Sequence, residues 1–207
     1  LVVLPEGPDD IARALDFAQT HGLEVSVRSG GHDILGASTT VSGVVIDLVR
    51  MSEVRVDPAK RIARAGAGGR ATILNTAAGV HGLAPVLGTV GNVGLGGLTL
   101  GGGIGWLSGS HGATVDNLLG VELVTADGRF LRATARENRD LFWALRGVGC
   151  NFGVATTFTY RLQPVTQVLA GVLSFKADVA SFLRFMRDFL EAAPDALDLV
   201  MLIPVHA

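Results

Sequence analysis

Two glycine-rich segments hold the residues best suited to chemistry. One is Arg28-Ser-Gly-Gly-His32, and the other runs from Val86 to Gly105, where nine of twenty residues are glycine. Adjacent glycines let main-chain N–H groups converge on an anion, and an arginine adds a planar cation suited to a pyrophosphate. In a packed helix or strand each glycine would cost about 0.5–1 kcal/mol. The two segments therefore predict exposed main chain that could enclose a large phosphate-bearing cofactor.

Other phosphate-binding and catalytic patterns match less well. Gly66-Ala-Gly-Gly-Arg-Ala71 has the form of a dinucleotide fingerprint, but Ala84–Gly88 lacks the expected acidic residue, which favours an ordinary strand–turn–helix. A P-loop needs a lysine, and none occurs between Lys60 and Lys176. The sequence also lacks a G-x-S-x-G nucleophile elbow.

The histidines and the cysteine narrow the metal chemistry. None of the five histidines pairs with another at metal-ligand spacing, and His21 and His81 precede helix-ending glycines as ordinary surface residues. The single cysteine excludes an internal disulfide and a cysteine-based metal cluster. We therefore predict no metal site. His32 stands apart because it closes the first glycine-rich segment.

Composition indicates a folded domain. Hydrophobic residues make up 48% of the 207 residues, charged residues make up 17%, and the net charge is −2. The basic residues are spread along the chain, which argues against a nucleic-acid partner. The sequence has no apolar run of about 18 residues, so we predict no membrane partner. Localisation is left open, with the cytoplasm slightly favoured.

Periodicity predicts alternating helices and strands. A helix begins at Pro8 with an apolar stripe through Ile11, Ala14, Leu15 and Ala18, and Gly22 follows as its C-cap. Asp127-Gly128 predicts a type I′ hairpin turn. The other expected helices are 71–80 and 138–146, and the expected strands are 2–4, 24–28, 44–48, 53–57, 61–65, 122–126, 129–135 and 154–162.

Glycine almost disappears after Pro164. We expect a strand over Leu169–Phe175, an amphipathic helix over Val179–Ala193 and a strand over Leu197–Ile203. This change predicts one domain over residues 1–165 and the beginning of a second, incomplete domain over 166–207. The chain also opens within a predicted strand and without methionine, which predicts further residues upstream of Leu1.

Six motifs in order resemble the FAD-linked oxidases that have a PCMH-type (vanillyl-alcohol oxidase-like) FAD-binding domain. The subgroup most similar is that of the berberine-bridge-enzyme-like oxidases. The motifs are Arg28-Ser-Gly-Gly-His32 with Gly36, Gly88-Thr-Val-Gly-Asn-Val-Gly-Leu-Gly-Gly97, Leu100-Gly-Gly-Gly-Ile-Gly-Trp106, Asp116-Asn-Leu-Leu119, Val124-Thr-Ala-Asp-Gly128 with Asp140-Leu-Phe-Trp-Ala-Leu-Arg-Gly147, and Asn151-Phe-Gly-Val154. The resemblance implies an α+β fold: a two-subdomain PCMH-type FAD-binding domain followed by the start of an α/β substrate domain.

The resemblance also implies which residues hold FAD. His32 would bond covalently to the 8α-methyl group of the flavin. Arg28, Ser29, Gly30, Gly31 and Asp33 would hold the pyrophosphate and neighbouring atoms. The ring and ribityl chain would be lined, largely by main chain, by Gly88, Thr89, Asn92, Val93, Gly94, Gly97, Leu98, Gly102 and Gly103. Val154 would meet the adenine end through its main chain, or else form part of a plain buried strand.

Many members of the subgroup attach the flavin a second time through a cysteine in the glycine-rich loop. Val90 occupies that position, and the only cysteine, Cys150, lies where the family commonly has glycine. We therefore predict FAD with a single covalent attachment, through His32.

The implied activity is that of an FAD-dependent oxidase. A CH–OH or CH–NH group of a small-molecule substrate would deliver hydride to flavin N5, and dioxygen would accept the electrons. A flavin-binding fragment without turnover and a dehydrogenase with another acceptor are the alternatives. No catalytic base can be assigned, and Glu122, Asp140 and His111 are expected to be structural. The sequence leaves open whether the chain forms a homo-oligomer, because missing strands would expose a sheet edge and an apolar face that favour association.

Overall fold

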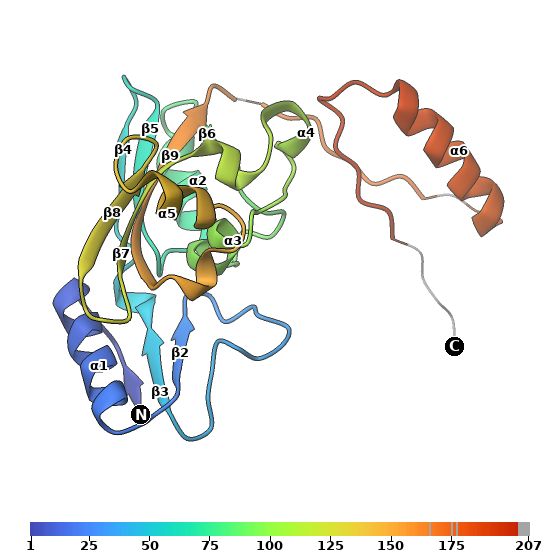
Figure 1. The fold of residues 1–207 in the computed structure, drawn as a ribbon. Coiled ribbons are helices and arrows are strands. Elements are labelled where there is room, and N and C mark those ends of the chain that lie inside the picture. The colour runs from blue at the N-terminus through green and yellow to red at the C-terminus, as the bar shows by residue number, and fades with distance from the viewer. Residues whose placement is uncertain (166, 175, 177, 203–207) are drawn as a thin grey trace.

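The computed structural model describes residues 1–165, 167–174, 176 and 178–202, with the side chain of Cys150 outside that description. Figure 1 shows a body built on two sheets, residues 1–165, and a separate arm that carries the last helix. The arm consists of the described residues after 165. The strands are β1 Val2–Val3, β2 Val25–Arg28, β3 Val44–Asp47, β4 Val54–Asp57, β5 Ile62–Gly66, β6 Ala84–Pro85, β7 Leu118–Val124, β8 Phe130–Thr134 and β9 Val154–Gln163. The α-helices are α1 Pro8–Thr20, α2 Ala71–Gly79, α3 Leu95–Leu100, α4 Ser108–His111, α5 Arg139–Ala144 and α6 Val179–Ala192. Short 3-10 turns occupy Leu48–Arg50, Thr114–Asn117 and Gly149–Asn151.

The first sheet is parallel and has the order β1-β3-β2. Helix α1 covers it with Ile11, Ala14 and Ala18, the buried part of the predicted stripe. Its C-terminus closes as a Schellman motif, in which Leu23 N–H donates to Ala18 O and Gly22 adopts a φ of +62°. The predicted helix and its cap are confirmed.

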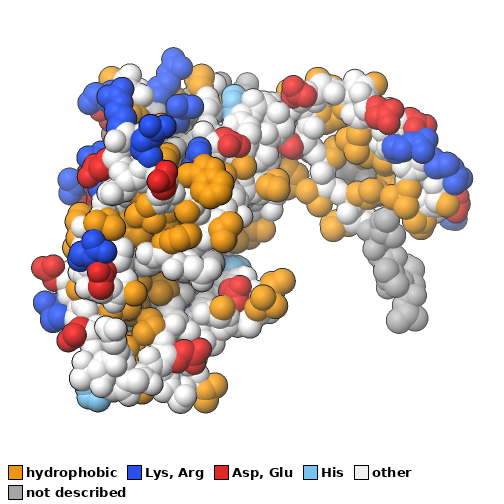
Figure 2. All heavy atoms as spheres, viewed as in Figure 1, with side chains coloured by type: hydrophobic (Ala, Val, Ile, Leu, Met, Phe, Trp, Pro, Cys, Tyr) orange, Lys and Arg blue, Asp and Glu red, His pale blue; other side chains and the backbone are white. Residues whose placement is uncertain are grey.

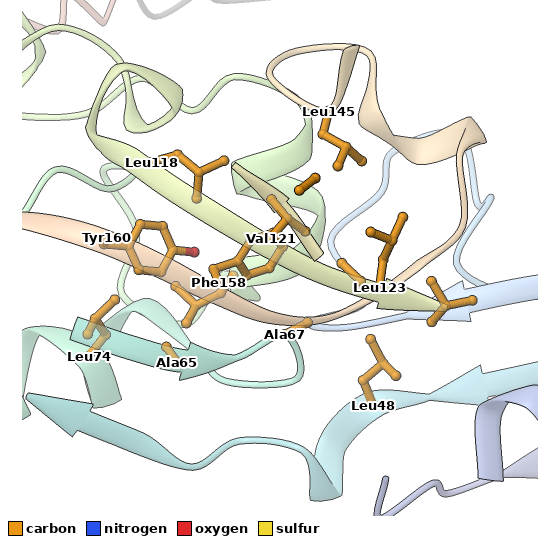
Figure 3. Packing of buried hydrophobic residues seen from close by; sticks show 14 of the residues in the cluster. Leu48, Ala65, Ala67, Leu74, Leu118, Val121, Leu123, Leu145, Phe158 and Tyr160 are labelled. Atoms are coloured by element: carbon orange, nitrogen blue, oxygen red, sulfur yellow. The ribbon is translucent and has the colours of Figure 1, made fainter. Parts of the chain in front are cut away.

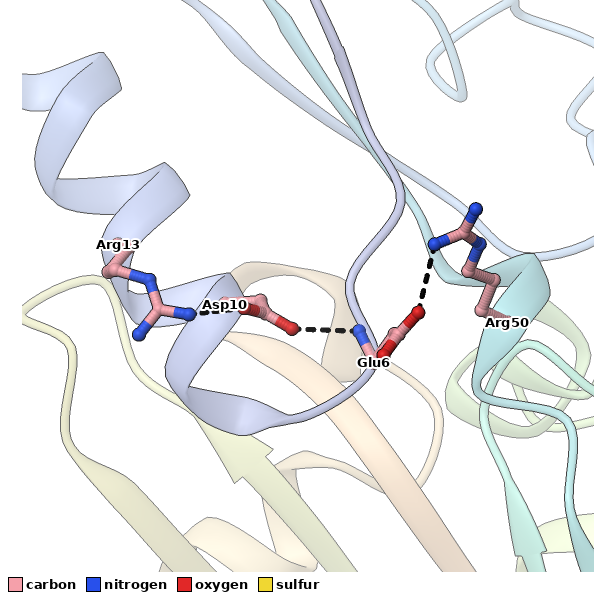
Figure 4. Close-up of polar contacts among 4 residues, drawn as sticks. All are labelled: Glu6, Asp10, Arg13 and Arg50. Carbon is pink, nitrogen blue, oxygen red and sulfur yellow. Dashed lines mark hydrogen bonds and ion pairs between the residues drawn. The ribbon is translucent and has the colours of Figure 1, made fainter.

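Polar contacts fix the N-terminal end of α1 (Figure 4). Asp10 Oδ2 accepts from the main-chain N–H of Glu6 at 2.9 Å, and a second oxygen pairs with Arg13. The hydrogen bond from Glu6 holds the pKa of Asp10 below its usual value. Glu6 in turn pairs with Arg50 at 2.9 Å, at the end of the 3-10 turn after β3. These contacts join the start of α1 to the turn that follows β3.

The second sheet is antiparallel in the order β4-β5-β9-β7-β8, and β6 also pairs with β9. Its core is seen in Figure 3, where Phe158 and Tyr160 of β9 lie among Leu74, Leu118 and Val121. All are buried. Two sheets of different type in one body confirm the α+β, two-subdomain fold.

The β7–β8 hairpin turn differs from the predicted type I′. Gly128 has a φ of +79°, whereas Asp127 is not among the residues with positive φ. Gly128 N–H donates to Thr125 O, and Thr125 N–H donates to Arg129 O. This is a three-residue loop ending in a left-handed glycine. The prediction was wrong because Asp-Gly suits both loop types and the register of the flanking strands decides between them.

The segment Gly66–Ala71 is a strand–turn–helix, as expected. A Cβ on Gly68 would stand 1.6 Å from Leu48 O, and one on Gly66 would stand 2.1 Å from Met51 O. The glycines therefore let main chain pack on main chain. Strand β5 lies in the antiparallel sheet, so the fingerprint-like spacing does not mark a parallel dinucleotide-binding unit.

The chain after residue 165 corrects the prediction in part. The helix is present as α6, whose N-cap Asp178 accepts from Ala180 N–H and Ser181 N–H. Within the described residues of 169–175 and 197–203 the backbone forms no strand, while Phe175 and Ile203 lie outside the description. A strand requires a partner for its N–H and C=O groups, and apolar alternation cannot supply one.

Helix α6 stands apart from the sheets in Figure 1 and buries none of its residues. The arm contacts the body where Ser110 Oγ donates to Asp195 O at 3.2 Å. Figure 2 shows hydrophobic side chains gathered along the arm. Among the described residues, no helix is both long and apolar enough to cross a membrane.

Candidate cofactor-binding site

Arg28 lies at the end of β2, opposite Asp47 at the end of β3. Its Nε donates to Asp47 Oδ2 at 2.9 Å, and its Nη2 lies 2.8 Å from the same oxygen. The side chains are 36% and 13% exposed, so this ion pair is partly shielded from solvent. Asp47, which sequence reasoning did not single out, therefore fixes the start of the loop. A pyrophosphate contact by Arg28 stays a prediction.

Ser29 ties this loop to two other segments. Its hydroxyl donates to Ala67 O at 2.6 Å and accepts from Gly96 N–H at 3.1 Å. Ala67 follows β5, and Gly96 lies in the first turn of α3. The side chain thus joins the two glycine-rich segments rather than standing free for a ligand.

Gly30 and Gly94 bring the two segments into direct main-chain contact. A Cβ on Gly30 would stand 2.3 Å from Gly94 N, and a Cβ on Gly94 would stand 2.2 Å from Gly30 N. Real side chains never approach so closely. Only glycine at both positions permits the contact, so the fold brings together the two segments that the sequence singled out.

His32 follows Gly31, whose φ of +73° turns the chain. The His32 side chain is exposed, and its Nε2 lies 3.4 Å from Asn92 Oδ1 of the second segment. Asn92 is held in turn by Arg70. Sequence reasoning missed Arg70, although it stands inside the Gly66–Ala71 turn that was weighed for other chemistry.

Asp33 is engaged by its own loop. Its Oδ2 accepts from Ala37 N–H at 2.6 Å, and Gly36 turns the chain with a φ of +77°. The carboxylate therefore stabilises the turn after His32. Its predicted contact with FAD remains a prediction.

Hydrogen bonds and side-chain packing anchor the second segment. Val93 O accepts from Ala71 N–H at 3.0 Å, and Thr89 O accepts from Trp106 Nε1 at 3.3 Å. A Cβ on Gly88 would stand 2.9 Å from Leu98 Cδ1, so these two predicted residues pack together. These contacts hold the second segment within the fold.

Part of the glycine stretch is helical, contrary to expectation. Leu95–Leu100 forms α3, although glycine disfavours helix. The close approach to the first loop overrides propensity here, because a Cβ on Gly96 would stand 3.0 Å from Ser29 Cβ. Hydrogen bonds from Leu95 N–H to Gly69 O and from Gly96 N–H to Ala67 O hold its first turn.

Whether this surface suits a flat ring depends on its open main chain, which lies at the exposed Gly97 and the half-buried Gly102. A Cβ at either position would meet nothing within 4 Å. Gly103, beside Gly102, has a φ of +73°, and a Cβ there would stand 2.3 Å from Thr114 Oγ1. That oxygen is the buried side-chain atom lacking a hydrogen-bond partner in the described part of the chain. Open space over glycine main chain is compatible with the cofactor that the motifs imply.

A buried hydrogen bond supports α3. Thr99 Oγ1 and Tyr160 OH lie 2.6 Å apart, and both residues are buried. Burial raises the pKa of the Tyr160 phenol, so it stays neutral and can share its hydrogen with Thr99.

The remaining candidates lie in structural settings. Val154 is buried at the start of β9 and pairs with Val124, so its main chain belongs to the sheet. Val154 thus forms part of a buried strand, the second of the two expectations for this residue. A contact with adenine stays a prediction. Glu122 pairs with Arg64 at 2.7 Å, which agrees with a structural role.

Comparison with known proteins identifies the class. A family model described as FAD binding domain matches residues 1–134. The FAD-linked oxidoreductase pgmH of Aspergillus terreus is 43% identical over 179 residues, 86% of this chain and 36% of that protein. The fold and the match together define a PCMH-type FAD-binding domain. The chain belongs to the FAD binding domain family.

Solved structures agree with this assignment. The chain is similar to 6-hydroxy-D-nicotine oxidase from Arthrobacter nicotinovorans, with a TM-score of 0.77 and 41% identity over 78% of this chain and 36% of that one. The sequence motifs predict a likeness to that enzyme, and this match confirms it. Glucooligosaccharide oxidase from Acremonium strictum has a TM-score of 0.73 and 34% identity over 78% of this chain and 34% of that one, and it is described with a 6-S-cysteinyl, 8α-N1-histidyl FAD. The chain thus spans little more than a third of these relatives.

Proposed function

We propose that this chain binds FAD across the contact between its two glycine-rich segments and holds it by one covalent bond, through His32. One observation carries the proposal. The fold brings the histidine that ends the first segment within 3.4 Å of Asn92 in the second segment. The second glycine-rich segment also has open space over the main chain of Gly97 and Gly102. The residues Arg28, Ser29, Gly30 and Asp33 would keep the first segment in shape. Gly97 and Gly102 would let the ring approach the main chain.

The single attachment rests on Val90. Glucooligosaccharide oxidase is described with both a cysteinyl and a histidyl link to FAD. Val90 stands at the position that the family resemblance gives to the cysteine, and it is exposed, so a flavin could contact it without bonding. We infer one link where that relative has two.

We further propose that the whole protein is an oxidase of a small molecule with a CH–OH or CH–NH group. The bound flavin would supply the hydride acceptor and pass the electrons to dioxygen. The relatives named as oxidases support this activity. Residues 1–165 would form the FAD-binding domain, and 166–207 would begin the substrate domain. The exposed apolar face of α6 supports that division.

The change His32→Ala tests the attachment. The unchanged chain should keep yellow colour and flavin fluorescence after acid precipitation and denaturation, and the variant should lose both because its ring nitrogen is gone. His81→Ala is the matched control, since His81 is an exposed histidine beyond the end of α2. Fluorescence that persists on denatured His32→Ala polypeptide contradicts the proposal.

Oxygen consumption tests the activity. The flavin-loaded protein is given a panel of sugars, alcohols and cyclic amines, and an oxidase should consume dioxygen with at least one. Flavin reduction without oxygen uptake would identify a dehydrogenase with another acceptor. A loaded chain that is not reduced by any of them would be a binding module.

A further inference from the structure

Asn92 lies between Arg70 and His32, where the two glycine-rich segments meet. Arg70 Nη1 donates to Asn92 O at 2.7 Å and also to Asn92 Oδ1. A guanidinium carries only donors, so the amide must present its oxygen here. Arg70 thereby settles which end of the Asn92 amide points toward the contact.

The same amide oxygen determines the protonation of the His32 ring. Asn92 Oδ1 can only accept, and it lies 3.4 Å from His32 Nε2, so Nε2 is the nitrogen that bears hydrogen. A neutral imidazole has one N–H, which leaves the lone pair on Nδ1. The nitrogen free to form a new bond is therefore Nδ1.

The orientation of the ring agrees with this protonation. His32 Cδ2 lies 3.3 Å from the place where a Cβ on Gly30 would stand. The Cδ2–Nε2 edge thus faces Gly30 and Asn92. In a five-membered ring Nδ1 is the atom opposite that edge, so the protein holds one side of the imidazole and leaves the reactive side free.

We propose that Arg70 is a positioning residue for flavin attachment, acting through Asn92 to keep His32 protonated at Nε2 and bonded to flavin at Nδ1. The inference rests on the proposed attachment through His32. In that step His32 Nδ1 bonds to the 8α carbon, which loses one hydrogen as a proton, and Nε2 releases its own proton. The two protons and the electron pair of the broken C–H bond pass to the flavin ring, and dioxygen then removes them.

The main chain of Arg70 is fixed independently of its side chain. Arg70 forms a bridge with Gly94, and the next residue, Ala71, donates to Val93 O at 3.0 Å. Substitution of the side chain removes the hydrogen bonds to Asn92 and keeps these main-chain contacts with Val93 and Gly94. Methionine keeps the apolar stem without the guanidinium, and lysine restores a single point charge.

The first test uses the chain produced without flavin and labelled with ¹⁵N-histidine. NMR of the ring nitrogens should find His32 protonated at Nε2, and Arg70→Met should shift it toward a mixture of both neutral forms. Hydrogen on Nδ1 in the unchanged chain overturns the inference. So does the same ratio of the two neutral forms of His32 in the unchanged chain and in Arg70→Met.

The second test follows attachment after FAD is added. Arg70→Met and Asn92→Ala should each slow covalent incorporation by about five- to tenfold, the effect of one lost hydrogen bond. For Arg70→Met, the Kd for FAD before the bond forms should stay within about twofold, because the main-chain bridge between Arg70 and Gly94 remains. The double variant should be no slower than Asn92→Ala, and Arg70→Lys should recover part of the rate. Arg13→Met is the control, because Arg13 is 72% exposed and pairs with Asp10 on α1.

The outcomes separate this inference from the proposed function. A chain that takes up FAD without any covalent bond contradicts attachment through His32, and the NMR result still decides the state of the ring. A bond formed at Nε2, or formed in Arg70→Met at the unchanged rate, overturns the role of Arg70 alone. A weakened Kd that accounts for the whole slowing would show a binding role instead.

Discussion

At the scale of the residue, glycines of one stretch meet two different demands. Gly94 faces another main chain, where a Cβ would stand 2.2 Å from Gly30 N. Gly97 faces open space, where a Cβ would meet nothing within 4 Å. The first requirement comes from the fold, whereas the open space at Gly97 fits the proposed approach of the flavin ring.

This difference predicts opposite effects of alanine. Gly94→Ala should lower the free energy of unfolding by about 1–3 kcal/mol, as overpacking does. Gly97→Ala should leave it unchanged or raise it by up to about 1 kcal/mol, because Gly97 lies in α3 and alanine favours helix. Gly97→Ala should nevertheless weaken FAD binding, since its methyl group would project from the bare surface. Urea unfolding and FAD titration measure the two effects.

The Gly97 result decides whether the surface holds the cofactor. Unchanged FAD affinity in a stable Gly97→Ala chain would place the ring elsewhere.

At the scale of the element, α3 depends on the sheet behind it. Glycine-rich Leu95–Leu100 has little helix propensity, and the buried Thr99–Tyr160 hydrogen bond fixes it to β9. The Tyr160 hydroxyl therefore supports the helix that carries Gly97, a residue of the proposed cofactor surface.

Replacement of Tyr160 by phenylalanine should cost about 1–3 kcal/mol at neutral pH, because Thr99 Oγ1 loses its partner while buried. The effect should also depend on pH. Burial raises the pKa of Tyr160, so above about pH 10 the unfolded phenol loses its proton before the folded one. The folded chain then binds more protons than the unfolded chain, so the free energy of unfolding falls as pH rises. Below about pH 10 the stabilisation from the neutral Tyr160 is complete.

The gap in stability between the unchanged chain and Tyr160→Phe should narrow between about pH 9 and 11. Tyr160 is the sole tyrosine, so ultraviolet absorbance follows its ionisation directly. Urea unfolding at each pH gives the gap. A gap that stays constant while the phenol titrates normally would contradict a buried, neutral Tyr160.

At the scale of the whole molecule, the arm exposes an apolar helix face. Val179, Leu183, Phe185, Phe189 and Leu190 of α6 are each 42–56% exposed, and the rings of Phe185 and Phe189 stack at 5.9 Å. Contiguous exposed apolar surface favours association. The chain as described therefore presents a face suited to another protein surface.

The double change Phe185→Ser and Phe189→Ser should reduce concentration-dependent self-association of this chain, measured by size exclusion with light scattering. Phe130→Ser is the control, because Phe130 is exposed to a similar extent on β8 of the body. Association that is equal in all three chains would rule out α6 as its source. The experiment also tests the homo-oligomer that the sequence left open.

The sequence by itself determined the local elements and the family. Pro8, the stripe of Ile11 and Ala14, and Gly22 predicted α1 and its cap, because these signals act within one helix. The ordered motifs indicated FAD, which the family match confirmed. The apolar alternation near Leu199 forms no strand among the described residues, because a strand also needs a partner that alternation cannot supply.

Tertiary structure alone decided the contacts within the candidate site. Gly30 and Gly94 are far apart in sequence, and their spacing gives no sign that their main chains touch. The same holds for Asp47 beside Arg28 and for Arg70 behind Asn92. Side-chain type and spacing determine what a segment can do locally. Which segments meet depends on how the two sheets pack, because only the closed fold sets distances between residues that the chain itself keeps apart.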